Sequence, residues 1–97
     1  MSNITCYIQD TTNNENCNID LDVNNYSMYQ EHIVLYMDKV SNEKKINDIF
    51  DNSDLCLNFI LILEGSAYFE CKILTIEPFF SNYLSVYITF KSKQNVN

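Results

Sequence analysis

The chain has 97 residues, 46% of them hydrophobic, which predicts one folded domain over residues 1–97 and excludes a disordered chain. Thirteen carboxylates face six lysines and no arginine, and the resulting net charge of -7 argues against direct nucleic-acid binding. No apolar stretch reaches the roughly 20 residues of a membrane-spanning helix, so we expect no membrane partner.

Four cysteines lie at positions 6, 17, 56 and 71, and no two of them form a CxxC pair. A structural zinc site normally uses such closely spaced pairs, so we expect no metal and no cofactor. The segment Met1–Thr5 has neither the basic nor the apolar region of a secretory signal peptide. We therefore expect reduced cysteines in the cytoplasm of a host cell, or in a virion.

Two N-terminal stretches alternate apolar and polar residues with the period of a strand. The apolar positions are Ile4, Cys6 and Ile8 in the first stretch, and Cys17, Ile19, Leu21 and Val23 in the second. The segment Asp10–Asn16 between them is polar. The pattern predicts a hairpin with a long tip, followed by a turn at Asn24 and Asn25.

The next segment has two interpretations. Its spacing of apolar residues fits a helix over residues 28–40, with Ser27 and Gln30 as a capping box. Its β-branched and aromatic residues favour a strand over Glu31–Lys39, which is the interpretation we prefer.

A helix is predicted over residues 41–52, with Ser41 or Asn42 as its N-cap. Ile46, Ile49 and Phe50 would form one narrow apolar stripe, at the spacing that places side chains on one face of a helix. We expect this stripe to pack across a sheet.

The C-terminal half predicts three strands. Leu55–Leu63 is apolar on both faces and should be a central strand, and Gly65 with Ser66 should form the turn after it. In the following strand the alternation changes phase between Ile73 and Leu74, which indicates a β-bulge, and Pro78 should end that strand. Leu84, Val86, Ile88 and Phe90 predict the last strand, and residues 92–97 a frayed tail.

These elements predict an α+β domain with about six antiparallel strands, arranged as a small sandwich or a partial barrel. One short helix is expected between the third and fourth strands.

Aromatic residues provide the first set of candidate binding residues. The segment Pro78–Tyr83 places three rings in a turn, and turns normally expose their side chains. The rings could fold back to plug the core, or they could anchor a partner. The aromatic candidates are Phe79, Phe80 and Tyr83 in this turn, Tyr26 and Tyr29 in a second predicted turn, and Tyr87 on the outer side of the last strand.

Carboxylates provide the second set. Asp20 and Asp22 should share the solvent face of one strand, and Asp10 could join them across the hairpin as a weak cation site. Asp48 and Asp51 would line the helix. Solvated acidic surface is the simpler interpretation of both groups. The single histidine, His32, has no surrounding catalytic motif, so we expect no enzyme.

Tyrosines and carboxylates together suit a basic protein surface, through cation–π and charge-assisted contacts. The sequence thus predicts a small acidic, non-enzymatic inhibitor that occludes a basic, nucleic-acid-handling protein. The asparagine- and isoleucine-rich composition suggests an AT-rich phage or mobile element, with an anti-defence role. The alternative is a structural assembly subunit of a virion or tail tube, because the two-faced strand Leu55–Leu63 could mediate homo-oligomerisation through sheet faces or edges.

Overall fold

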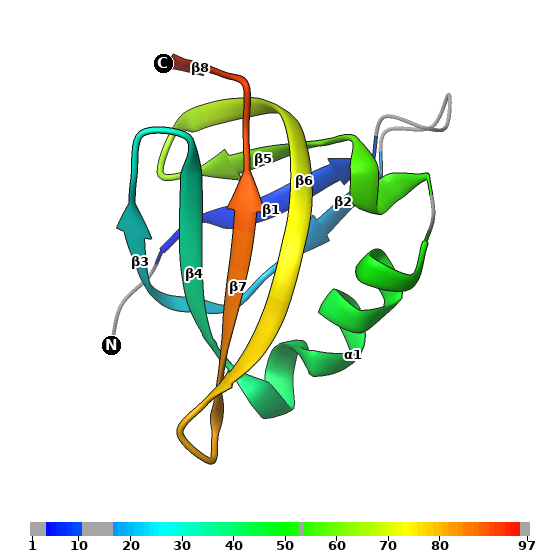
Figure 1. Ribbon diagram of the computed structural model, residues 1–97, viewed down its shortest axis with the longest axis vertical. Helices are drawn as coiled ribbons and strands as arrows, with labels where there is room; N and C mark the ends of the chain where they lie inside the picture. Colours follow the sequence, from blue (N-terminus) through cyan, green and yellow to red (C-terminus); the bar gives the residue numbers. More distant parts are fainter. Residues whose placement is uncertain (1–3, 11–16, 53, 96–97) are drawn as a thin grey trace.

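The computed structural model describes residues 4–10, 17–52 and 54–95, which form an antiparallel sheet structure with one α-helix (Figure 1). The elements in chain order are β1 (Cys6–Asp10), β2 (Cys17–Asp20), β3 (Val23–Met28), β4 (His32–Asp38), α1 (Lys39–Asp51), the short 3-10 helix η1 (Leu55–Leu57), β5 (Phe59–Leu63), β6 (Ser66–Phe79), β7 (Tyr83–Thr89) and β8 (Ser92–Asn95). The α+β class is confirmed. The described residues contain eight strands, where about six were predicted, and the helix follows the fourth strand.

The two additional strands have separate origins. The strand predicted over residues 17–23 is interrupted at Leu21 and Asp22, which separate β2 from β3. The turn expected at Asn24 and Asn25 is absent: β3 continues through both residues, with a register shift between Val23 and Asn25. Residues 92–95, predicted as frayed, form β8. They pair with Ser66–Phe69 at an edge of β6 that β7 leaves open, so backbone groups on both sides gain partners.

Strand β6 connects the two parts of the sheet. The order is β2-β1-β5-β6-β7-β4-β3, and β6 pairs with β5 and β8 near its start and with β7 from Lys72 to Phe79. A bridge between Ile4 and Val23 links the segment before β1 to β3, at the opposite end of this order. The sheet therefore curls toward closure, as a partial barrel does.

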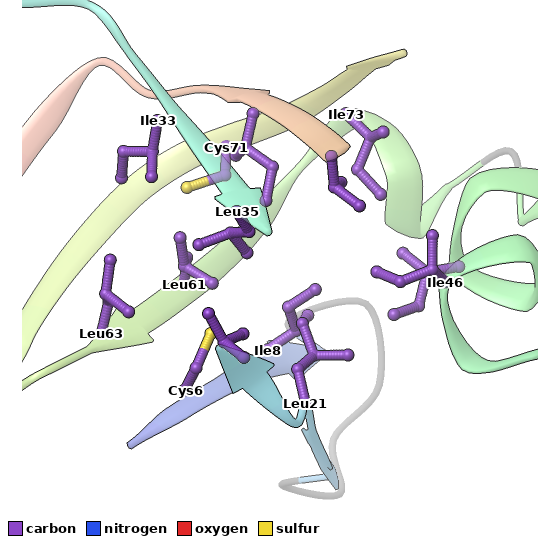
Figure 2. Packing of buried hydrophobic residues seen from close by; sticks show 14 of the residues in the cluster. Cys6, Ile8, Leu21, Ile33, Leu35, Ile46, Leu61, Leu63, Cys71 and Ile73 are labelled. Carbon is purple, nitrogen blue, oxygen red and sulfur yellow. The ribbon is translucent and has the colours of Figure 1, made fainter. Parts of the chain in front are cut away.

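The core lies inside this curled sheet, and helix α1 lies at one side of it. Side chains from β1, β4, β5 and β6 converge there, among them Ile8, Leu35, Leu61 and Cys71 (Figure 2). Ile46 and Ile49 of α1 are buried in the same cluster, whereas Phe50 is 41% exposed. The predicted helical stripe is therefore correct at two of its three positions.

The strand interpretation of residues 31–39 is confirmed by β4, and the helical alternative is wrong. β4 lies between β3 and β7, and Ile33, Val34 and Leu35 are consecutive buried residues. Because this strand is buried on both faces, its apolar residues do not alternate strictly with polar ones. The missing alternation is the reason that the sequence also fitted a helix.

The start of helix α1 differs from the prediction. Asp38 is the N-cap, and its Oδ2 accepts a hydrogen bond from the Ser41 backbone N–H at 3.0 Å. Asn42 is fully buried inside the first turns. Its side chain accepts from the Asp22 N–H at 2.8 Å and donates to the Asp22 carbonyl at 2.9 Å. Asn42 therefore fastens the helix to the corner between β2 and β3.

The remaining local predictions around β6 have mixed outcomes. The β5–β6 turn holds Glu64 at φ 52° and Gly65 at φ 81°, the left-handed pair that a tight two-residue hairpin requires. The bulge after Ile73 is confirmed by a register shift between Ile73 and Thr75. Pro78 does not end its strand, because β6 continues to Phe79. Residues 55–57, predicted as strand, form η1.

Candidate functional site

The outward surface of strands β4, β7 and β6 carries most of the predicted aromatic candidates. Residues directly opposite one another in antiparallel strands share a face, so the pairing register assigns side chains to rows. The outer rows, starting at the β6–β7 turn, are Asp38, Tyr83 and Phe79; then Tyr36, Ser85 and Glu77; then Val34, Tyr87 and Thr75; then His32, Thr89 and Lys72. We call this surface the aromatic face, after Tyr36, Phe79, Tyr83 and Tyr87.

The inner rows of the same strands differ in chemistry. They contain aliphatic side chains from Leu35, Val86 and Ile33 with Ile88, all at 0% exposure. In these rows aliphatic residues therefore point into the core, and the rings of the aromatic face alternate with them along the strands and point outward.

The rings gather most closely at the β6–β7 turn, at the lower end of the molecule in Figure 1. The centroids of the Tyr36 and Phe79 rings lie 5.2 Å apart, and those of Phe79 and Phe80 lie 4.7 Å apart with their planes at 61°. A groove of about 470 Å³ opens beside them. Its lining consists of Asn24, Asn25, Tyr36, Phe79, Phe80 and Tyr83, and we call it the tip groove.

Phe80 is the least protected of these rings. It is 81% exposed, and its backbone φ of 55° lies in the left-handed region. That region costs a non-glycine residue about 1–2 kcal/mol. The backbone of the turn is nonetheless held in place, because the Lys39 N–H donates to the Asn82 carbonyl at 2.8 Å.

The structure brings together four of the six aromatic candidates. Phe79, Phe80, Tyr83 and Tyr87 lie on the aromatic face or at its tip, and Phe79 and Tyr83 are 40% and 39% exposed. The interpretation that Phe79 and Phe80 plug the core is therefore wrong.

The other two aromatic candidates lie elsewhere. Tyr29 stacks on His32 at the opposite end of the face, with ring centroids 4.6 Å apart. Tyr26 lies within β3, not in a turn, and packs against the core. Tyr36 was not among the predicted site residues. Strand alternation could have identified it, because it stands between the buried Leu35 and Met37.

The four acidic candidates do not lie on the aromatic face. Asp20 ends β2, Asp22 occupies the corner before β3, and Asp48 and Asp51 belong to α1. Asp48 pairs with Lys44 at 2.9 Å. The expected meeting of Asp10 and Asp20 is wrong, because Asp20 pairs with Tyr7 while Asp10 pairs with Cys17, at the other end of the ladder.

The aromatic face has its own charged residues. Asp38 and Glu77 stand in the two rows nearest the tip, and Lys72 stands in the row farthest from it. Other lysines interact with their neighbours: Lys39 pairs with Glu43 at 3.7 Å and Lys91 with Glu70 at 3.8 Å. The tip end of the face is thus acidic and aromatic.

A second, larger hollow of about 940 Å³ lies near the far end of the same strands. Its lining includes Glu31, Glu70, Lys72 and Lys91. Carboxylates and ammonium groups are mixed there, and the Lys91–Glu70 ion pair balances part of the charge. This hollow therefore has no clear preference for a ligand of either charge.

The described cysteines act as apolar side chains. Cys6 and Cys71 are free thiols, and both are buried. Burial raises the pKa of the Cys6 and Cys71 thiols to about 12, so both stay protonated at neutral pH and are poor nucleophiles. Within residues 4–10, 17–52 and 54–95, no three Asp, Glu, His or Cys side chains gather in a way that could hold a metal ion. Within the same ranges, no helix has the length and apolar character needed to cross a membrane.

Comparisons of the chain with protein-family models, with curated proteins and with solved structures found no match.

Proposed function

We propose that this chain is a non-enzymatic binding domain that docks its aromatic face on a basic protein surface and occludes it. The main support for the proposal is the exposed ring of Phe80 at the tip of the aromatic face. Its ring is 81% exposed and so contributes little to folding, and its left-handed backbone disfavours the folded state. An exposed ring contributes most when a partner buries it, and buried aromatic anchors dominate the binding energy of protein interfaces.

The charge of the chain supports a basic partner. A net charge of -7 attracts a cationic surface at long range and speeds the encounter. The most extensive cationic protein surfaces are those that handle nucleic acids, because such surfaces neutralise phosphates. The binding surface of an inhibitor with this charge would compete with the nucleic acid for them.

Affinity capture from the lysate of the natural host, with mass spectrometry, tests this function. The wild-type chain should retain a basic protein, and added salt should weaken the capture. The double variant Phe80→Ala/Tyr83→Ala should lose that protein. Phe50→Ala is the matched control, since Phe50 of α1 is 41% exposed, like Phe79, but lies outside the aromatic face. Capture that resists salt, or that the double variant retains, would contradict the proposal.

The alternative of an assembly subunit was based on a second apolar face of the segment 55–63 and on a strand-rich layout that could associate through sheet edges. The first of these observations is weaker in the folded chain. Residues 55–57 form η1, and Ile62, on the second face of β5, is only 7% exposed within a single chain. Size-exclusion chromatography with light scattering tests the alternative, since a tube or virion subunit should form oligomers as its concentration rises.

A further inference from the structure

We propose that the tip groove is an aromatic cage that receives one arginine side chain of the basic partner. The inference rests on the proposed function and specifies the chemistry that the aromatic face would recognise. Four rings line the groove together with two asparagines, and no charged side chain is among the lining residues. Aromatic rings attract a cation through the negative charge of their π faces, and a groove walled by several rings adds these attractions.

The geometry of the rings leaves π faces available. The Tyr36 and Phe79 rings are tilted by 46°, and the Phe79 and Phe80 rings meet at 61°. Rings packed face to face would cover each other, whereas tilted rings present their faces to the space beside them. Phe80 contributes most of the accessible face because it is 81% exposed.

Tyr68, elsewhere in the same molecule, makes a cation–π contact with a lysine of this chain. The Lys93 ammonium lies 5.7 Å from the centroid of the Tyr68 ring, within the range of a cation–π interaction. At the tip, Lys39 is tied to Asn82 through its backbone, yet its ammonium pairs with Glu43 at 3.7 Å. Among the described lysines, none is placed over the rings of the tip groove.

Electrostatics around the groove favour a cation over an apolar side chain. Glu77 stands in the same row as Tyr36, and Asp38, whose carboxylate caps helix α1, stands in the row of Tyr83 and Phe79. The chain as a whole carries a charge of -7. An apolar anchor of a partner would gain nothing from these carboxylates, whereas a cationic side chain would gain from both the rings and the charge.

The aromatic walls favour arginine over lysine. Asn24 and Asn25 line the groove beside the rings, but the Asn25 Oδ1 accepts from the Tyr26 N–H at 2.8 Å and the Tyr36 hydroxyl accepts from the Ser27 hydroxyl at 3.3 Å. A guanidinium group is planar and stacks on aromatic rings. An ammonium group is more strongly hydrated and has three donors, so it loses more on leaving water.

The test uses the full chain and two peptide probes. An oligo-arginine peptide is titrated into the protein and followed by NMR of the aromatic rings and by calorimetry. An oligo-citrulline peptide of equal length keeps the planar shape of the side chain, but it replaces one nitrogen donor with a carbonyl oxygen and removes the charge. Phe80→Leu keeps an apolar side chain at the exposed tip but removes the π face, and Phe50→Leu on α1 is its matched control.

The cage predicts that oligo-arginine shifts the ring resonances of Phe79, Phe80 and Tyr83, and that oligo-citrulline does not. Phe80→Leu should weaken oligo-arginine binding by about two- to fivefold, which corresponds to one exposed cation–π contact. Phe50→Leu should bind like wild type.

Two results would overturn the cage. One is wild-type affinity in Phe80→Leu, and the other is equal binding of oligo-citrulline. If either occurs while the double variant Phe80→Ala/Tyr83→Ala still loses the captured basic protein, the proposed function stands and the cage alone is wrong. If the double variant keeps that protein, the aromatic face itself is not the docking surface.

Discussion

The two halves of strand β6 each carry an aromatic ring and adjoin a turn with positive φ, but the rings differ in their exposure. In the first half, Tyr68 is 2% exposed and packs edge-on against Phe90, with ring centroids 4.9 Å apart. The turn that begins this half places Glu64 and Gly65 at positive φ values of 52° and 81°, and Glu70 within the strand has a φ of 53°. At the end of the second half Phe79 is 40% exposed, and the turn that follows places Phe80 at a positive φ of 55°.

The difference between the halves lies in the face that each ring occupies. Tyr68 belongs to the buried core, whereas Phe79 stands in an outer row with Tyr83. Strands β5 and β8 also flank the first half, and β7 flanks the second half on one side. Folding alone explains a buried tyrosine and a glycine in a tight turn. Folding does not explain an exposed phenylalanine in a backbone conformation that glycine or asparagine adopts more easily. Exposed apolar residues in an unfavourable backbone conformation, such as Phe80, are therefore the best candidates for a binding role.

The largest expected effect comes from removing the buried ring. Tyr68→Ala should lower the free energy of unfolding by about 3–4 kcal/mol, because it leaves a cavity and removes the contact with Phe90. Phe80→Ala, the matched change in the exposed half, should shift that free energy by at most about 0.5 kcal/mol. Urea denaturation measures both. Similar losses in the two variants would show that the halves do not differ in coverage.

The two turns should also respond differently to a β-branched residue. Gly65→Val should destabilise the fold by about 2 kcal/mol, because valine strongly disfavours a φ of 81°. Phe80→Val places the same residue at a position where part of the left-handed cost is already present, so it should destabilise the fold less than Gly65→Val does. The comparison uses the same denaturation experiment, and a large loss for Phe80→Val would mean that the Phe80 ring stabilises its turn.

The loss of stability at alkaline pH tests whether water is excluded from the Cys71 thiol in the first half of β6. Burial raises the pKa of the Cys71 thiol to about 12, above its ordinary value of 9.0. The folded state therefore keeps this proton while the unfolded chain releases it. The stabilising contribution is complete below pH 9 and is lost as the pH rises toward 12. By pH 10 one such thiol should cost about 1.4 kcal/mol relative to pH 8.

The variant Cys71→Ala isolates that contribution. Its stability should fall less between pH 8 and pH 10 than that of the wild type, since all other titratable groups are the same in both chains. Urea denaturation at the two pH values gives the difference. Equal losses in the two chains would indicate that water reaches the Cys71 sulfur.

Local patterns in the sequence predict the local elements well. Alternation identifies the first hairpin and the last strand, the phase change after Ile73 identifies a bulge, and Gly65 identifies a turn. Each of these depends on neighbours within a few residues. The role of Asn42 could not be predicted, because its partner Asp22 lies 20 residues earlier and only the folded chain brings them together. β8 was missed for a similar reason, since four exposed polar residues form a strand only because the edge of β6 beside them is open.

The candidate site was predictable in composition but not in exposure. The sequence places Phe79, Phe80 and Tyr83 in one turn, and it leaves open whether another element covers them. That depends on the position of α1, which packs its buried residues Ile46 and Ile49 against the core and leaves the tip uncovered. The acidic candidates lie away from the aromatic face for a different reason: a count of charges does not say which face carries them.

The smallest expected change is also the sharpest test of the comparison. Phe80→Gly removes an exposed ring and relieves the left-handed backbone, so it should raise the free energy of unfolding by about 0.5–1 kcal/mol. Oligo-arginine binding should fall by about two- to fivefold in the same variant. Denaturation and calorimetry on one preparation measure both quantities. Higher stability together with weaker binding is the result expected if Phe80 serves binding at the expense of stability. If both stability and binding fall, Phe80 is a structural residue like Tyr68.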